Sequence, residues 1–324
     1  FKALDANLHA QESRGLGDVY KRQNLSFDEF KFSDLENIYM ATVIGLRDYV
    51  SKNNFPGVIL GLSGGIDSAF CAAVAVDALG KDKVEAYMLP SNYTSENSTI
   101  DAEDCANRLE INLETIPISD TFLSLEESLK TSFKGLPNDI TEENLQSRIR
   151  GTILMAISNK KGKMLITTGN KSEVSVGYST LYGDMNGGFN PIKDIYKTEL
   201  YALANWRNIN LPNNILLDKK DVIPASIISK EPTAELRDNQ KDSDSLPPYD
   251  ELDQILEGLV EYELSTSELE KKGFSREEIK KVENLLYVSE YKRRQSAPGV
   301  KISLRNFGRD RRYPITNKFR DKIE

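Results

Sequence analysis

Short apolar runs alternate with longer amphipathic stretches through the first half of the chain. The strand candidates are nearly continuous apolar runs, at residues 57–62, 83–89, 112–118 and 163–168. The helix candidates carry apolar residues at three- and four-residue spacing, at about 67–79, 97–110, 120–133 and 141–159. Such alternation, with strands that are apolar throughout, is typical of a parallel sheet covered by helices on both faces. The pattern therefore predicts an α/β fold with a doubly wound, Rossmann-like parallel sheet.

The flanking regions have a different texture. Residues 1–31 show no sustained period and are expected to be an N-terminal remnant outside the fold, which leaves one domain over residues 32–324. A loop rich in glycine and tyrosine covers 177–191, and the polar segment 211–246 is expected to close over a site as a lid. Further helices are predicted near the N-terminus of the domain, behind Ser33, and at 194–207, 248–262 and 275–293.

Composition fits a soluble globular protein, with 39% hydrophobic and 28% charged residues. The net charge of −8 argues against a protein dedicated to nucleic-acid binding. No apolar run approaches the ~20 residues that a membrane span needs. Cys71 and Cys105 lack metal-ligand spacing, so we expect two buried thiols in a cytoplasmic protein. The one histidine, His9, is a weak candidate for catalysis.

The first predicted strand runs into a Ser-Gly-Gly-Ile-Asp-Ser turn that opens a helix. Backbone N–H groups at such a helix start are unpaired and favour an anion. Gly64 and Gly65 have no Cβ, so a phosphate chain can lie against this backbone. Ser63 and Ser68 add hydroxyl donors. Asp67 would repel a bare phosphate, and its presence therefore indicates a magnesium ion; a plain Asp-capped turn is the simpler alternative.

The fourth predicted strand brings polar groups to the same edge of the sheet: Thr168, Asn170, Lys171 and Glu173. Glu173 is a candidate for the second carboxylate of the metal site, and Lys197 for a charge that meets the phosphates. The alternative for Glu173 is a carboxylate that only stabilises a helix N-terminus. That alternative would be preferred if Glu173 stood alone.

The glycine turn resembles the SGGxDS loop of ATP pyrophosphatases, enzymes that cleave ATP between its α- and β-phosphates. Further motifs are similar to those of the NAD⁺ synthetase family, in its glutamine-dependent branch: NLQSRIRGTILMA, TTGNKSE, YGD, PIKD, EPTAEL and YKRRQ. The resemblance covers residues 33–320. It implies the adenine nucleotide alpha hydrolase-like fold, extended by C-terminal helices.

The resemblance also implies roles for single residues. The ATP-binding positions would be Ser63, Gly64, Gly65, Asp67, Ser68, Thr168, Lys197 and Thr233. The deamido-NAD-binding positions would be Asn144, Arg148, Glu173, Tyr178 and Lys292. Asp67 and Glu173 would coordinate magnesium. Lys197 and Asp184 would act in catalysis, the latter beside the entering ammonia.

The implied reaction is the last step of NAD⁺ biosynthesis. ATP adenylates the carboxylate of deamido-NAD, pyrophosphate leaves, and ammonia then displaces AMP. Leu181 and Gly188 depart from the ammonia-only members, so the substrate contacts at those two positions do not transfer. The residues before Phe32 are too few for the glutaminase domain of the glutamine-dependent branch. We therefore expect an ammonia-using synthetase part of a longer protein, forming a homodimer or larger homo-oligomer.

Two other functions stay open at this point. An RNA-modifying sulfur or nitrogen transferase could use the same loop, and the basic tail at 291–312 is its best support. That reading also requires a thiol pair and an RNA-binding domain. A nucleotide sensor without activity would require the loss of Asp67, Glu173 or Lys197, and all three are present. For Lys292, the alternative to substrate binding is simple stabilisation of a helix C-terminus.

Overall fold

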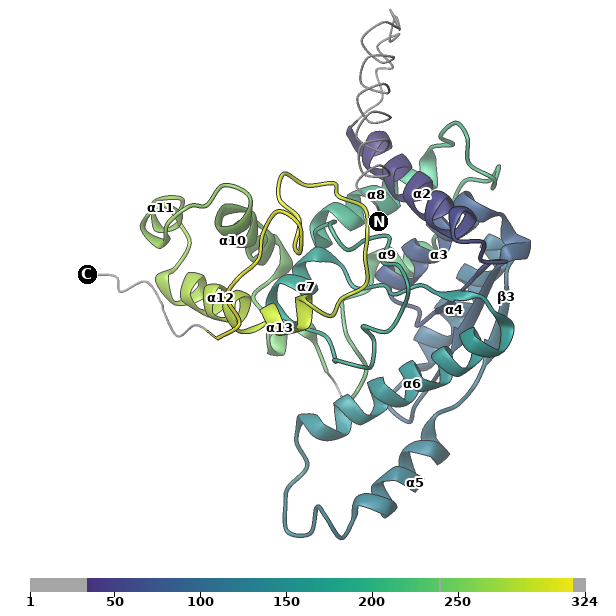
Figure 1. Ribbon diagram of the computed structural model, residues 1–324, viewed down its shortest axis with the longest axis horizontal. Helices are drawn as coiled ribbons and strands as arrows, with labels where there is room; N and C mark the ends of the chain where they lie inside the picture. The colour runs from purple at the N-terminus through teal and green to yellow at the C-terminus, as the bar shows by residue number, and fades with distance from the viewer. Residues whose placement is uncertain (1–33, 239, 317–324) are drawn as a thin grey trace, which may run out of the picture. The chain divides into compact units, whose positions relative to one another are not determined.

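The computed structural model describes residues 34–238 and 240–316, and its centre is a parallel sheet with the strand order β3-β2-β1-β4 (Figure 1). The strands are β1 Val58–Gly61, β2 Val84–Met88, β3 Asn112–Thr115 and β4 Met164–Leu165. β1 pairs in parallel with β2 on one side and with β4 on the other. The winding therefore reverses between β1 and β4, and open parallel sheets bind ligands at such a crevice. The predicted doubly wound α/β fold is confirmed.

Helices cover both faces of this sheet. They are α2 Asp34–Lys52, α3 Ile66–Leu79, α4 Glu96–Leu109 and α6 Ile140–Lys161, while α5 Ser119–Leu129 packs against α6. Alternate side chains of β1 point to opposite faces, so Val58 and Leu60 join the main core with α3, whereas Ile59 packs toward α6. α3 is buried on nearly every side, because its small residues let neighbouring elements approach closely.

The later helices build a second core. They are α7 Lys171–Val176, α10 Tyr249–Val260, α11 Thr266–Lys271 and α12 Arg276–Val288, followed by the short α13 Glu290–Arg293. The two helices between them, α8 Lys197–Ile209 and α9 Ala225–Ser229, pack into the main core instead. Val174 and Val176 of α7 pack with apolar residues of α10, α11 and α12. Figure 1 shows α7 beside α12 and α13, away from the strands. Although α7 directly follows β4 in the sequence, it therefore packs with the C-terminal helices and not with the sheet.

Several element boundaries differ from the sequence pattern. The third strand was expected to be buried, but Asn112, Glu114 and Thr115 are exposed, because β3 lies at the edge of the sheet. The helix expected from 194 starts only at Lys197, since the Asp194 carboxylate instead accepts backbone N–H groups from the C-terminal tail.

The last predicted helix, 275–293, is divided. Ser289 ends α12 and precedes α13, and its hydroxyl donates to the Val176 carbonyl at 2.8 Å. None of the described helices combines the length and the apolar character that crossing a bilayer requires. Cys71 and Cys105 are both buried, with free thiols. Ser33, His9 and the predicted remnant at 1–31 lie outside the described residues.

Candidate active site

The two glycines after β1 meet different needs. Gly64 has a φ of +79°, and a Cβ there would lie 2.2 Å from the backbone oxygen of Ser98. Gly65 has an ordinary φ of −97°, and the nearest atom to its Cβ would be Ser63 Oγ at 3.4 Å. Gly64 is thus required by backbone conformation and by the close approach of α4. Only Gly65 fits the expectation of open backbone facing a phosphate, and it lines the cavity described below.

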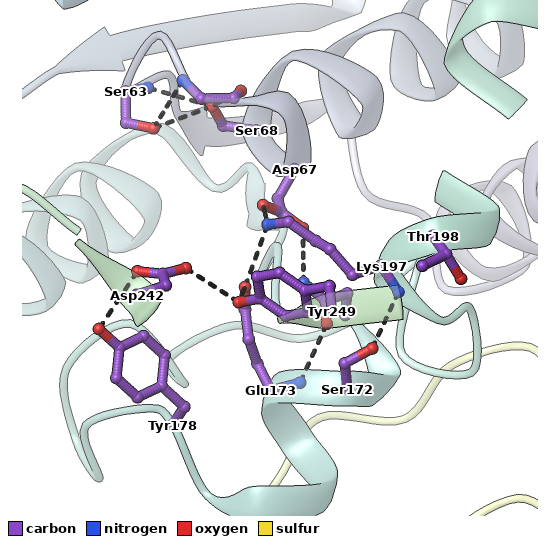
Figure 2. A network of polar contacts seen from close by, with 12 residues as sticks. Ser63, Asp67, Ser68, Ser172, Glu173, Tyr178, Lys197, Thr198, Asp242 and Tyr249 are labelled. Carbon is purple, nitrogen blue, oxygen red and sulfur yellow. Dashed lines mark hydrogen bonds and ion pairs between the residues drawn. The ribbon is translucent and has the colours of Figure 1, made fainter. Parts of the chain in front are cut away.

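Two serine hydroxyls hold the turn in shape (Figure 2). Ser68 Oγ accepts from the backbone N–H of Ser63 at 3.2 Å and donates to the Gly65 carbonyl at 3.0 Å. The hydroxyls of Ser63 and Ser68 lie 3.1 Å apart. This pairing presents both hydroxyls at the mouth of the turn, where the α3 helix begins.

Asp67, Glu173 and Lys197 converge from three elements at this edge (Figure 2). The Lys197 ammonium, almost fully buried, forms ion pairs with Asp67 Oδ2 and, at 3.2 Å, with Glu173 Oε1. Asn170 Nδ2 donates to the other Asp67 oxygen at 2.7 Å. The sequence therefore correctly indicated that the two carboxylates would lie together. A single ammonium is therefore shared by two carboxyl groups.

Burial shapes the ionisation of this group. Loss of solvent raises the pKa of Glu173 to about 8; Lys197 opposes the shift and Asp67 adds to it. For Lys197, burial alone would lower the pKa, but Asp67 and Glu173 outweigh it and raise the pKa. Lys197 therefore stays charged, and a second cation beside Glu173 would lower the pKa of that carboxyl again.

Asp242 and two tyrosines surround this centre (Figure 2). Tyr178 donates to Asp242 Oδ1 at 3.2 Å, and Tyr249 donates to Asp242 Oδ2 at 2.9 Å. Tyr249 also lies 3.4 Å from Glu173 Oε1. Asp242 and Tyr249 were not among the predicted site residues. Asp242 comes from the polar segment 211–246, and only its place in the expected lid pointed to it.

The two carboxyl groups are of the kind that binds Mg²⁺ where phosphate oxygens complete its ligands. Within the described ranges, no cluster of three His, Cys, Asp or Glu side chains is placed to bind a metal by itself. Mg²⁺ is commonly bound by one or two carboxylates together with phosphate oxygens and water. Asp67 and Glu173 supply that pair of oxygen ligands beside the glycine turn.

A cavity of about 340 Å³ lies at the carboxyl ends of β1 and β4, within the usual size of small-molecule sites. The predicted site residues that line it are Ser63, Gly65, Asp67, Ser68, Thr168, Glu173, Tyr178, Asp184, Lys197 and Thr233. Segments far apart in the sequence therefore meet around one space.

Three predicted residues are not among those that line the cavity, and they contact the loop that follows α7. Asn144 accepts a hydrogen bond from the Thr180 hydroxyl at 2.8 Å, and Arg148 donates to the Leu181 carbonyl at 3.2 Å. Lys292 donates to the carbonyls of Gly177 and Ser179, at 2.8 and 2.6 Å. Its ammonium thus binds this loop and not the end of its own helix. Neither interpretation of the sequence, substrate binding or stabilisation of the helix C-terminus, had included this contact.

The braced loop carries Asp184 into the cavity. Its carboxylate accepts the Thr180 N–H at 2.7 Å, and its own N–H donates to Ser147 Oγ at 3.0 Å. Loss of solvation raises the pKa of Asp184 to about 6. Hydrogen bonds from backbone N–H groups and the charge of Lys292 oppose the shift. The residue remains open to the cavity, so water there moderates this effect.

The segment around Thr233 is fixed to the N-terminus of α4. Thr233 Oγ1 donates to the Gln240 carbonyl at 2.6 Å. Glu235, in a left-handed conformation, accepts from the hydroxyls of Ser95 and Ser98 at 2.8 and 2.6 Å. Lys230 lies 3.4 Å from the same carboxylate. Lys230 directly precedes the EPTAEL motif and Glu235 lies within it. Both line the cavity, yet neither was predicted as a site residue.

Two basic residues differ from expectation. Arg150, two positions after the predicted Arg148, is the arginine of this pair that lines the cavity. Its Nε donates to the Leu89 carbonyl at 2.9 Å, and burial lowers its pKa to about 10. Lys171 was expected at the sheet edge with Glu173, but its fully buried ammonium points into the second core. There it pairs with Glu261 and, at 2.9 Å, with Asp194.

Residues 38–296 match the NAD synthase family. The chain belongs to this family. It is 53% identical over 289 residues to the glutamine-dependent NAD(+) synthetase of Rhodobacter capsulatus, a match that covers 89% of this chain and 52% of that protein. The chain spans about half the length of the curated relatives it matches. The family resemblance found in the motifs is therefore confirmed.

Solved structures of the same family share the fold. One is the glutamine-dependent NAD⁺ synthetase from Acinetobacter baumannii in complex with ADP, with a TM-score of 0.58 and 46% identity over 88% of this chain and 50% of that chain. Another is the NH3-dependent NAD synthetase from Campylobacter jejuni, with a TM-score of 0.61 and 26% identity over 79% of this chain and 94% of that chain. The fold extends across nearly the whole of that second protein.

Proposed function

We propose that this chain amidates deamido-NAD to NAD⁺, the last step of NAD⁺ biosynthesis, with ATP and ammonia as co-substrates and AMP and pyrophosphate as products. The observation that carries the proposal is the convergence of Asp67, Glu173 and Lys197 beside the glycine turn. Family membership supports it, because the relatives are named NAD(+) synthetases.

In the first step, a carboxylate oxygen of deamido-NAD bonds to the α-phosphorus of ATP, and the bond to the β-phosphate breaks. The Gly65 backbone and the hydroxyls of Ser63 and Ser68 would hold the phosphates, with Thr168 and Thr233 on either side. Lys197 would neutralise charge on the departing pyrophosphate. Positioning and electrostatics account for the rate, because this step needs no nucleophile from the protein.

Asp67 and Glu173 are the residues that would hold magnesium. A bound Mg²⁺ ion supplies further charge neutralisation on the phosphate oxygens. The raised pKa of Glu173 agrees with a carboxylate that lacks one cation partner. Asp242 lies close enough to Tyr249 and Tyr178 to orient them toward this group.

In the second step, ammonia attacks the acyl carbon of the adenylate, and AMP leaves. Asp184 would accept the proton that the attacking nitrogen releases, since a pKa of about 6 leaves it ionised at neutral pH. Asn144, Arg148 and Lys292 would shape the deamido-NAD site through the 177–181 loop, and Tyr178 would contact the substrate directly.

The proposed nitrogen donor for this stretch of chain is ammonia itself. The match to the Campylobacter jejuni protein, which is named NH3-dependent, covers 94% of that chain and supports this choice. In the glutamine-dependent relatives, this chain matches about half of the protein. Buried free thiols suit the cytoplasm, and we propose a homodimer or larger homo-oligomer there.

The test is turnover by the purified chain with deamido-NAD, ATP, Mg²⁺ and ammonium chloride. We expect NAD⁺, AMP and pyrophosphate in equal amounts, and no NAD⁺ when glutamine replaces ammonium. Lys197→Met should lower kcat at least a hundredfold, whereas Lys52→Met, on the exposed face of α2, should not change it. Formation of ADP and phosphate in place of AMP and pyrophosphate would overturn the adenylation step.

The basic tail gives little support to an RNA-modifying activity. Arg293 is buried and donates to the carbonyls of Ser175 and Leu286. Arg305 and Arg311 both form ion pairs with Glu263. These positive charges are therefore used within the fold.

A further inference from the structure

Helix α8 starts at Lys197, but the groups that cap its first turn come from other helices. Tyr196, at the cap position, makes no side-chain hydrogen bond to the helix start. The backbone N–H of Lys197 instead donates to Ser172 Oγ at 2.9 Å, from α7. The N–H of Thr198 donates to Asp253 Oδ2 at 2.9 Å, from α10. The N–H groups of a first helical turn have no partner within the helix, so these contacts fix where α8 begins.

Asp253 joins these contacts into one unit. Its Oδ1 accepts the hydroxyl of Ser172, and its Oδ2 also accepts the hydroxyl of Thr198, at 2.8 Å. The residue is 5% exposed and Ser172 is fully buried. Hydrogen bonds to a buried carboxylate are worth more than those in water, and losing one leaves a polar group unpaired.

Each helix that Asp253 holds carries one member of the charged centre. Ser172 is adjacent to Glu173, and Thr198 is adjacent to Lys197. The ion pair between Lys197 and Glu173 is 3.2 Å long, so a small movement of either helix start would change it. Figure 2 shows the Lys197 backbone held by Ser172 while its side chain reaches Asp67.

We propose that Asp253 is a positioning residue, which places the Lys197 ammonium against Asp67 and Glu173 by capping α8 and anchoring α7 from the second core. The expected fall in kcat rests on the proposed function, whereas the capping of α8 does not. Misplacement of a catalytic group by about 1 Å can lower a rate roughly a hundredfold.

The first measurement needs no turnover. Amide hydrogen exchange is followed at Lys197 and Thr198 in the wild-type chain and in Asp253→Ala. We expect exchange at these two amides to be at least tenfold faster in the variant than in the wild type, because their acceptors are lost or loosened. Exchange at the amides of α3, which serve as the reference, should not change. Unchanged protection would show that Asp253 does not cap α8, whether or not the chain makes NAD⁺.

The second measurement is steady-state kinetics with deamido-NAD, ATP and ammonium. Asp253→Asn keeps one acceptor oxygen, so we expect a tenfold fall in kcat, and a larger fall for Asp253→Ala. The fall in kcat should exceed any change in the KM for deamido-NAD, since Lys197 is not proposed to bind that substrate and Glu173 is only one of its proposed contacts. Ile255→Val is the matched control: it thins the packing of the same helix, and should lower the melting temperature with kcat unchanged.

The outcomes are distinct. An inactive wild-type chain refutes the proposed function, and hydrogen exchange still decides the capping. Asp253→Asn with wild-type kcat and a lowered melting temperature, as in Ile255→Val, refutes the positioning role. If the Asp253 variants do not fold, Ser172→Ala decides instead, because it removes the same bridge; we expect kcat to fall tenfold there, and normal kcat overturns the inference.

Discussion

At the scale of single residues, the two glycines of the turn show how adjacent positions can serve separate physical ends. Gly64 makes room for the backbone of α4 and adopts a left-handed conformation, whereas Gly65 leaves a space open. A glycine pair in a nucleotide-binding turn is usually explained by the ligand alone. Here Gly64 is explained by packing of the turn against α4, and only Gly65 by space for a ligand.

This difference gives a prediction for stability. Gly64→Ala should lower the free energy of unfolding by about 2 kcal/mol or more, because it combines left-handed strain with a contact to backbone that cannot move aside. Gly65→Ala is the control, and should change it by less than ~1 kcal/mol, since its φ is ordinary. Urea denaturation of the two variants measures both. An equal loss of unfolding free energy in the two variants would contradict the separate roles given to Gly64 and Gly65.

Lys292 gives a prediction for substrate binding. Its ammonium holds the carbonyls of Gly177 and Ser179, so Lys292→Ala should loosen the loop that carries Tyr178 and Asp184. We expect a KM for deamido-NAD about tenfold higher, or about 1.4 kcal/mol, with the KM for ATP nearly unchanged. Wild-type kinetics for deamido-NAD, with only a lower melting temperature, would leave Lys292 a purely structural role.

At the scale of elements, local pattern and remote contact decide different features. The strands β1 and β2 and the helices α3 and α6 follow apolar periodicity, and the sequence predicts them well. Short helices such as α7 and α11 were not predicted, because six residues are too few to be stable without tertiary packing. The start of α8 could not be placed, because its caps lie in α7 and α10.

Glu85 of β2 offers an electrostatic prediction at this scale. Partial burial alone would raise its pKa, but hydrogen bonds from Lys161, Lys163 and Tyr87 lower the pKa from 4.5 to about 2. A carboxyl whose pKa falls on folding stabilises the protein above its unfolded pKa, and that stability is lost as pH drops from 4.5 toward 2.

Glu85→Gln should therefore lower the free energy of unfolding by about 1–2 kcal/mol at pH 7, after allowance for the exposure of Lys161. The difference from wild type should shrink at pH 3. Glu127→Gln, which removes an exposed pair with Lys130, should have an effect below ~0.5 kcal/mol. A Glu85→Gln effect that grows on acidification would show that the sign is wrong.

At the scale of the whole molecule, a buried lysine connects segments that the sheet does not. The Lys171 ammonium, fully buried, pairs with Asp194 before α8 and with Glu261 after α10, and it donates to the Arg305 carbonyl in the tail. The second core is thereby tied to the loop that leads into α8.

Lys171→Met tests this connection. The substitution leaves Asp194 and Glu261 buried without their cation, and breaking a buried pair in this way costs about 3–5 kcal/mol. We expect a loss of that size in the free energy of unfolding by guanidinium denaturation. Lys52→Met removes an exposed pair with Asp48 and should cost less than ~1 kcal/mol. A loss of similar size in both variants would mean that the buried pairs of Lys171 do not stabilise this connection.

The difference between local motifs and remote contacts also explains how much of the site could be predicted from the sequence. Asp67, Glu173 and Lys197 lie in compact motifs at strand or helix ends, and topology alone brings such ends together. Asp242, Tyr249 and Asp253 come from a polar segment and an amphipathic helix whose local pattern resembles that of any surface helix. Their positions depend on contacts across more than fifty residues of chain, which periodicity and spacing do not encode.

The capping of α8 by α10 has a consequence for judging gene fragments. The glycine turn, the TTGNKSE segment, Lys197 and the EPTAEL segment all precede Tyr249, where α10 begins. An open reading frame that stopped just after EPTAEL would keep these motifs and would be counted as an intact enzyme by motif search. It would lack Asp253, and with it the group that fixes the start of the lysine-bearing helix. Catalytic competence in such shortened genes should therefore be judged by whether the frame continues through α10.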